Sequence, residues 1–93
     1  MYRIIDKRGS GKTSRLMLLA KEKNGIFVCS NPDAMKYKAH AYGLTGFDII
    51  SYYQLVNQKD INLEHKPVFI DELDSFLNSL GYNIYGYSLT DED

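Results

Sequence analysis

Apolar residues come in short runs that polar turns separate along the whole chain. The runs with the length and the β-branched or aromatic content of strands are Tyr2 to Ile5, Gly25 to Cys29, Phe47 to Ser51 and Val68 to Ile70, with Ile84 to Leu89 as a fifth candidate. Gly25 to Cys29 contains no charged residue, which is typical of a strand that is buried on both faces of a parallel sheet.

Helical patterns fill the gaps between these runs. They cover Lys12 to Asn24, Asn31 to Gly43, Tyr52 to Val56, and the stretch from Leu73 to Gly81. Asn31 followed by Pro32 indicates a helix start, because proline lacks an N–H that the first turn does not need. Strands and helices that alternate at this spacing predict an α/β fold in three layers, with a mostly parallel sheet of about five strands between flanking helices.

A chain of 93 residues has room for one hydrophobic core. We therefore expect a single domain over residues 1–89 and an acidic tail over 90–93. No apolar run approaches the roughly 18 residues of a membrane-spanning helix, so a membrane partner is not expected. Arg3 and Asp6 interrupt the first apolar stretch, which argues against a signal peptide. Cys29 is the single cysteine and cannot form an internal disulfide, so we expect a cytoplasmic protein.

The formal net charge of -1 hides an uneven distribution. Residues 1–40 contain nine Lys or Arg and three Asp or Glu, a local charge of +6, and the remaining residues carry -7. This split favours a first part that faces phosphate or another anion and an acidic part that holds a cation. The alternative is that both parts are solvated helix faces.

The segment from Asp6 to Thr13 matches the phosphate-binding pattern G-x-x-x-x-G-K-[ST], except that Asp6 occupies the place of the first glycine. Gly9 and Gly11 allow the backbone to turn successive N–H groups inward, and the helix that follows adds its positive end. The residues expected to bind a nucleotide are Arg8, Gly9, Ser10, Gly11, Lys12, Thr13 and Ser14.

Within this loop we expect Lys12 to reach the β and γ phosphates as a catalytic cation, and the Thr13 hydroxyl to bind Mg²⁺. The alternative interpretation, a glycine-rich turn with a capped helix, leaves Lys12 unexplained. The Asp6 carboxylate would repel phosphate unless it turns away or pairs with Lys7, Arg8 or Lys12.

Two acids, Asp71 and Glu72, close the apolar run Val68 to Ile70. This is the form of a Walker B motif, in which Asp71 would hold Mg²⁺ through its water shell and Glu72 would orient and deprotonate the attacking water. The same pattern also describes a strand followed by the acidic first turn of a helix. Together with the phosphate loop, the Walker B interpretation is the better of the two.

With both motifs the chain resembles the P-loop NTPases, in the branch that has an additional catalytic glutamate after the Walker B aspartate. Tyr2 to Leu18, with Arg8 before Gly-Ser-Gly-Lys, resembles the start of bacteriophage large-terminase ATPases and related helicase-like motors. The resemblance implies a small protein of a bacterial or phage-infected cell that binds ATP or GTP with Mg²⁺. It also implies a strand between the two Walker strands that ends in a γ-phosphate sensor, here Ser88 or Thr90.

Members of that family are much longer and carry an arginine finger, and no arginine of this chain lies beyond Arg15. We therefore expect slow hydrolysis, because the charge of the transition state is poorly compensated. One alternative is a degenerate P-loop module that acts by binding a protein, such as a phage accessory factor or an inhibitor of a host system. Another is a nucleoside kinase, because Ile70 to Phe76 resembles the strand end of thymidine kinases.

The size of the sheet and the charge pattern bear on partners other than the nucleotide. A homo-oligomer or a protein partner is expected, because a small sheet leaves its edges partly bare. The net charge does not indicate nucleic acid, although Lys36 and Lys38 alternate with aromatic Tyr37. Tyr52 and Tyr53 either stack on a nucleobase or cover the sheet.

Overall fold

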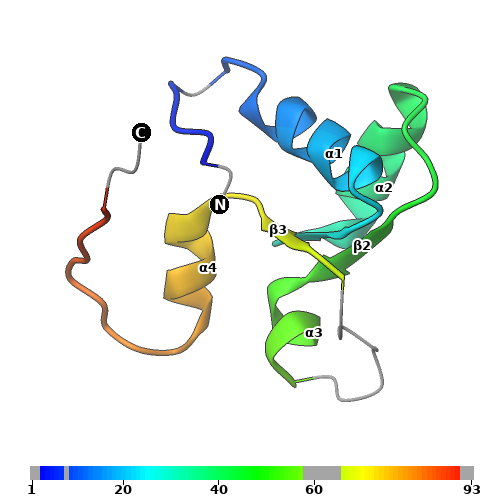
Figure 1. Ribbon diagram of the computed structural model, residues 1–93. Helices are drawn as coiled ribbons and strands as arrows, with labels where there is room; N and C mark the ends of the chain where they lie inside the picture. The colour runs from blue at the N-terminus through cyan, green and yellow to red at the C-terminus, as the bar shows by residue number, and fades with distance from the viewer. Residues whose placement is uncertain (1–2, 8, 58–65, 91–93) are drawn as a thin grey trace.

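The computed structural model describes residues 3–7, 9–57 and 66–90 (Figure 1). Over these residues helices and strands alternate along the chain, as the sequence predicts. The helices are α1 (Lys12–Glu22), α2 (Pro32–Ala41), α3 (Tyr52–Asn57) and α4 (Leu73–Ser79), and the strands are β1 (Ile26–Cys29), β2 (Asp48–Ser51) and β3 (Val68–Ile70). The protein thus has an α/β fold with a small parallel sheet and flanking helices.

The sheet has the strand order β2-β1-β3, and both pairs of neighbours are parallel. Phe27 of β1 lies opposite Ile49 of β2 and Phe69 of β3. Every residue of β1 is buried, which is the expected environment for a central strand without charged residues. The carboxyl ends of the three strands lie at the same edge of the sheet, because the strands are parallel.

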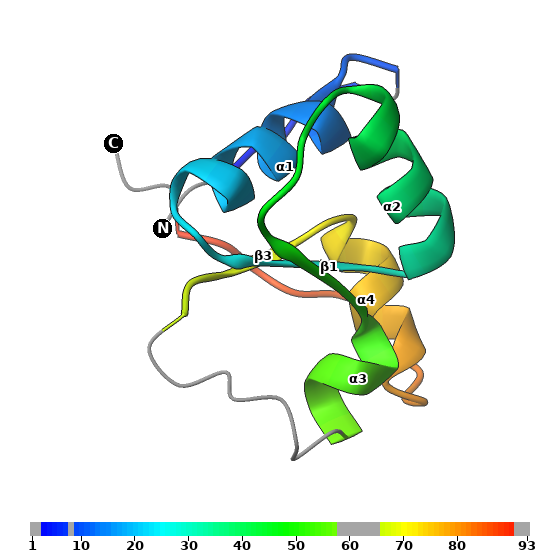
Figure 2. The same cartoon turned by 90° about the vertical axis from the view of Figure 1, so that its right-hand side faces the viewer.

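Two apolar clusters hold the helices on opposite faces of this sheet (Figure 2). The cluster under α1 and α2 consists of Leu16, Met17, Ala20, Phe27, Cys29, Ala39, Ile49 and Phe69. The cluster under α3 and α4 consists of Ile26, Val28, Ile50 and Tyr52, with Leu55, Ile70 and Phe76 packed against it. Alternate residues of β1 enter the two clusters, as the pleat of a strand requires.

The helix boundaries follow local signals in the sequence. The Asn31 side chain accepts a hydrogen bond from the Ala34 N–H at 3.2 Å, and Pro32 opens α2, so the predicted start is confirmed. After α1, Asn24 adopts a left-handed conformation with φ of 52°, and the Gly25 N–H donates to the Ala20 carbonyl at 2.8 Å. No helix in the described ranges combines the length and apolarity needed to cross a bilayer.

Two expected strands do not form, so the described sheet has three strands rather than about five. Arg3 to Ile5 carry no regular secondary structure, and Tyr2 lies outside the described residues. Ile84 to Leu89 also form no strand, and the Tyr85 side chain is 93% exposed. A short alternating run becomes a strand only where its backbone finds a ladder to join. Tyr87 instead attaches this segment to α4, because its hydroxyl donates to the Asp74 carboxylate.

Candidate functional site

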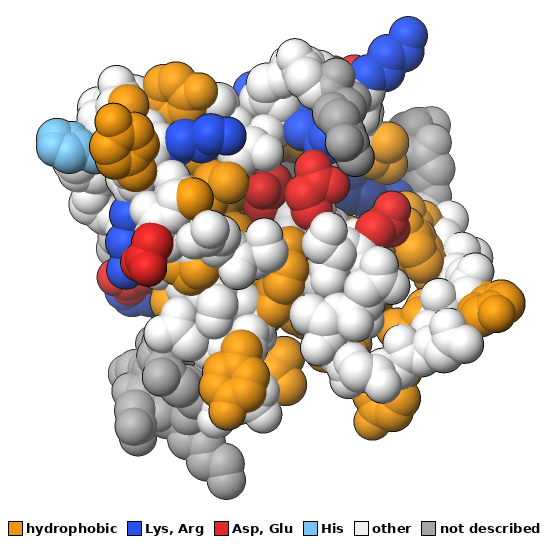
Figure 3. All heavy atoms as spheres, turned by 180° about the vertical axis from the view of Figure 1, so that it is seen from behind, with side chains coloured by type: hydrophobic (Ala, Val, Ile, Leu, Met, Phe, Trp, Pro, Cys, Tyr) orange, Lys and Arg blue, Asp and Glu red, His pale blue; other side chains and the backbone are white. Residues whose placement is uncertain are grey.

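The glycine-rich loop and the acidic pair meet at the edge of the sheet where the strands end. The Thr13 hydroxyl lies 3.2 Å from Oδ1 and 3.4 Å from Oδ2 of Asp71, to which it donates a hydrogen bond. The Lys12 Nζ atom lies 3.3 Å from Glu72 Oε1. The structure therefore brings together the four residues that the two sequence motifs single out. Figure 3 shows acidic side chains next to basic ones near the middle of one face.

The loop before α1 has the backbone that its glycines permit. Gly9 and Gly11 have φ of 80° and 83°, a left-handed conformation that other residues rarely adopt. The Ser10 N–H donates to the Lys7 carbonyl at 3.2 Å, which closes the turn. Gly11 provides no side-chain cap, and the first turn of α1 has no acidic residue. The first N–H groups of α1 are thus available to an anion.

The remaining predicted loop residues surround this helix start. Gly9, Ser10 and Gly11 are exposed, and Ser14 is half-buried in the first turn of α1. Arg8 lies outside the described residues. A ligand that approaches the helix N-terminus would therefore meet an open backbone rather than a closed pocket.

Asp71 is the buried acid of the site, with 7% of its surface exposed. Burial raises the pKa of its carboxyl, and the neighbouring Glu72 adds to this effect. The hydrogen bond from Thr13 acts in the opposite direction, as do the charges of Lys12 and Lys38. A carboxylate in this environment is an incompletely compensated negative charge, and an arriving cation would stabilise it.

Glu72 lies on the exposed side of the site and forms a half-exposed ion pair with Lys12. Its backbone has φ of 55° and ψ of 76°, a left-handed conformation that is rare for a residue with a side chain. Phe76 of α4 donates its N–H to the Glu72 carbonyl at 3.0 Å, so Glu72 also starts that helix. Asp71 and Glu72 therefore form the whole connection between the end of β3 and the start of α4.

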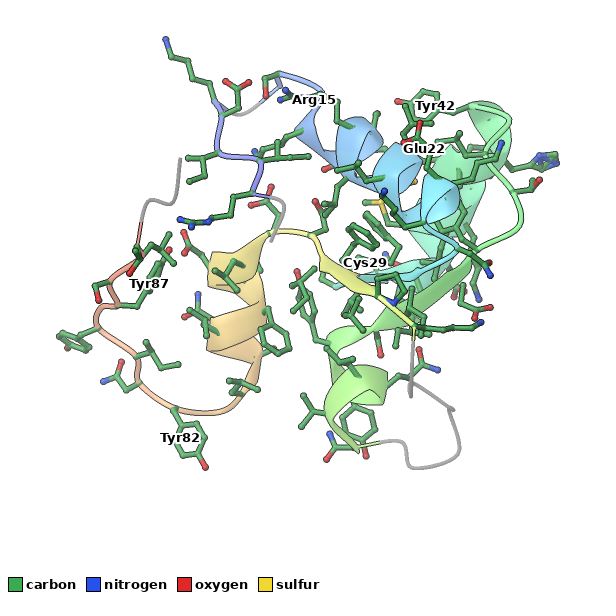
Figure 4. The ribbon with its side chains drawn as sticks, viewed as in Figure 1. Arg15, Glu22, Cys29, Tyr42, Tyr82 and Tyr87 are labelled. Carbon is green, nitrogen blue, oxygen red and sulfur yellow. The ribbon has the colours of Figure 1, made fainter. Side chains whose placement is uncertain are left out.

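The structure pairs Asp6 with a residue that sequence analysis did not propose. The Asp6 carboxylate accepts hydrogen bonds from the Lys7 backbone N–H at 2.8 Å and from the Arg15 guanidinium at 2.9 Å (Figure 4). These two hydrogen bonds lower the pKa of Asp6. The signal in the sequence was the position of Arg15 four residues after Gly11, about one helical turn, which places its side chain above the loop. The pairing offsets the repulsion expected between Asp6 and phosphate.

The residues proposed as sensors lie away from this cluster. Ser88 and Thr90 are exposed, and they belong to the segment without regular secondary structure. Figure 1 shows this segment beyond α4, on the side away from β3. The structure does not bring either residue to Thr13 or Asp71, because the strand that would carry them there does not form.

Tyr52 contributes to the site in a way that its sequence position did not indicate. Only 6% of its surface is exposed, so it covers the sheet and is not available to stack on a base. Its hydroxyl donates to the Asp71 backbone carbonyl at 2.5 Å and lies 3.3 Å from the Glu72 carbonyl. The neighbouring Tyr53 is 72% exposed.

Comparisons of this chain with models of protein families, with curated proteins and with solved structures found no match. The site is therefore interpreted from its own atoms. These provide a helix N-terminus, a lysine, a hydroxyl on a buried carboxylate, and a second carboxylate on the solvent side.

Proposed function

We propose that this protein binds ATP or GTP together with Mg²⁺ and hydrolyses the nucleotide slowly. The observation that carries the proposal is the contact between the Thr13 hydroxyl and the buried Asp71 carboxylate, next to the open N-terminus of α1. A structural turn needs neither a buried acid nor a lysine beside it. A bound phosphate with its cation explains both.

The donor set fits Mg²⁺ shared with phosphate. Mg²⁺ prefers oxygen ligands, keeps several waters, and is commonly held by one or two carboxylates plus substrate phosphates. Thr13 and Asp71 would supply the protein oxygens. Over residues 3–7, 9–57 and 66–90 no group of three or more His, Cys, Asp and Glu side chains could hold a metal by itself. The proposed cation therefore depends on the nucleotide, whose phosphate charge it would neutralise.

Lys12 and Glu72 would exchange partners when the nucleotide binds. Their ion pair is partly exposed, so it is weak enough to open. Lys12 would then contact the β and γ phosphates. Glu72 would be free to orient a water molecule and accept its proton.

The P-loop NTPase fold is part of this proposal, with this chain as a small version of it. Two features support it: the glycine loop leads directly into α1, and the acidic pair follows a parallel strand, β3, beside the start of that helix. Slow turnover is expected because no arginine follows Arg15 in the sequence. A complete motor would need groups that compensate the charge of the transition state.

Calorimetric titration with ATP and with GTP, each with Mg²⁺, tests the proposal. Lys12→Ala should weaken binding about 10- to 100-fold, since a hydrogen bond to a charged group contributes about 1.5–3 kcal/mol. Lys21→Ala is the matched control, because Lys21 is an exposed cation in the last turn of the same helix. An absence of binding at millimolar nucleotide, with Lys12→Ala indistinguishable from the parent, would contradict the proposal.

A second candidate is a binding module that acts through a protein partner or through a second copy of the chain. The exposed apolar side chains of the last described segment favour it, and these are Tyr82, Tyr85, Tyr87 and Leu89. Sedimentation of the parent and of Tyr85→Ser distinguishes self-association from a monomer. A parent that sediments as a monomer would exclude a second copy of the chain as the partner, and the binding module would then act on a different protein.

A further inference from the structure

Tyr52 connects the two outer strands of the sheet at the site. It follows β2, whereas Asp71 follows β3, and β1 lies between these strands. The Tyr52 hydroxyl nevertheless donates to the Asp71 carbonyl at 2.5 Å and lies 3.3 Å from the Glu72 carbonyl. One side chain therefore spans the end of the central strand and holds the turn that carries both acids.

The ring of Tyr52 is fixed in this position. It packs edge to face against Phe76 of α4, with the ring centroids 5.4 Å apart and the planes at 70°. It also belongs to the buried cluster of Ile26, Val28 and Ile50. Burial raises the pKa of the Tyr52 hydroxyl to about 12, so the hydroxyl stays protonated at alkaline pH as well as at neutral pH.

The turn that Tyr52 holds is one that requires support. Glu72 has a left-handed backbone, and such a conformation persists only where the surroundings fix it. The Asp71 N–H donates to the Val28 carbonyl at 2.8 Å, and the Phe76 N–H donates to the Glu72 carbonyl at 3.0 Å. The Tyr52 hydroxyl adds a contact to the backbone of this turn from the opposite edge of the sheet.

We infer that Tyr52 is a positioning residue for the acidic pair: its hydroxyl fixes the backbone of Asp71 and Glu72 so that one carboxylate meets Thr13 and the other meets Lys12. The inference rests on the proposed function but goes beyond it, because Tyr52 is buried behind the turn and would touch neither nucleotide nor cation. Small displacements of catalytic groups lower turnover strongly, so the effect belongs to kcat.

Tyr52→Phe tests this inference, because it retains the ring against Phe76 and removes the hydroxyl. Tyr53→Phe is the matched control at the exposed neighbouring position. For Tyr52→Phe we expect kcat of nucleotide hydrolysis to fall about 10- to 100-fold. We expect nucleotide affinity without Mg²⁺ to stay unchanged, because the glycine loop is untouched. A kcat equal to that of the parent would overturn the inference.

Hydrogen exchange of the nucleotide-free protein provides a readout that does not depend on the proposed function. The amides of Asp71 and Phe76 should exchange faster in Tyr52→Phe, and those of α1 and β1 should not. Faster exchange throughout the core would indicate a general packing role and would overturn the inference. If the parent binds no nucleotide, the proposed function fails, and the exchange pattern alone decides whether Tyr52 holds the turn.

Discussion

The Thr13 hydroxyl and the Asp71 carboxylate lie 3.2 Å apart although 58 positions separate them in the chain. Their contact depends on how α1 packs against the sheet. Leu16, Met17 and Ala20 are buried in the same cluster as Phe27 and Phe69. This packing fixes the N-terminus of α1 beside the end of β3, so the apolar core sets the geometry of the polar site.

Asp71→Asn is expected to stabilise the nucleotide-free protein near neutral pH and to abolish the effect of Mg²⁺ on nucleotide affinity. Burial raises the Asp71 pKa above its ordinary value of 3.8, so the folded state binds this proton more tightly than the unfolded state. This difference lowers the free energy of unfolding. The loss is absent at low pH, develops as the pH rises through the Asp71 pKa of the unfolded state, and is complete above the pKa of the folded state. Thermal unfolding of both proteins across this pH range measures it. A parent more stable than Asp71→Asn at neutral pH would contradict the expectation.

Glu72→Gln should lower turnover about 10²- to 10⁴-fold, the usual contribution of a general base. Nucleotide should still bind, with affinity at most about fivefold tighter, because the half-exposed ion pair with Lys12 contributes no more than about 1 kcal/mol. Steady-state kinetics and calorimetry measure the two effects. Glu22→Gln, at the far end of α1, is the control (Figure 4). Unchanged turnover in Glu72→Gln would contradict the role of Glu72 as the general base.

Asp6→Gly and Arg15→Ala should shift nucleotide affinity in opposite directions. The first removes a carboxylate at the loop, whereas the second leaves that carboxylate without its guanidinium partner. Both groups are about half-exposed, so each change should stay below about fivefold. Titrations at low and high salt should show the difference shrinking as salt screens the charges. Weaker binding by Asp6→Gly would show that the ion pair positions the loop.

Gly25→Ala should destabilise the fold by about 1–3 kcal/mol, the usual cost of overpacking. A Cβ atom at Gly25 would lie 2.6 Å from the Pro67 carbonyl oxygen and 2.8 Å from Phe69 Cε2. The carbonyl belongs to the backbone and accepts the Ile26 N–H at 2.8 Å, so it cannot easily move. Gly86→Ala is the control, because nothing lies within 4 Å of its Cβ position. Denaturant unfolding measures both variants against the parent. A Gly25→Ala variant as stable as the parent would show that the backbone at the start of β1 moves to make room for the methyl group.

Cys29 should resist alkylation in the folded protein at mildly alkaline pH and react fully in denaturant. Its side chain is buried, and burial raises the thiol pKa to about 11, so almost no thiolate is present. Mass spectrometry after iodoacetamide treatment measures the modified fraction. Rapid labelling of the native protein would show that β1 opens locally.

Several elements could be predicted because their signals are local. The apolar run of β1 is buried at every position, and Asn31 with Pro32 opens α2. Ile84 to Leu89 show why such predictions can be wrong. Their composition suits a strand, but pairing needs a partner edge, and the sequence of the segment does not contain that information.

The sequence by itself determined the chemical groups of the candidate site: the glycines of the loop, Lys12 with Thr13, and Asp71 with Glu72. Motif spacing carries this information because the loop must lead directly into a helix and the acids must end a strand. Only the tertiary structure decided that Arg15 pairs with Asp6, and that Tyr52 holds the acidic turn from the opposite edge of the sheet. Contacts of this kind depend on which side chains packing brings together. Buried polar groups at the end of a sheet need hydrogen-bond partners, and the tertiary structure determines which groups lie close enough to bond.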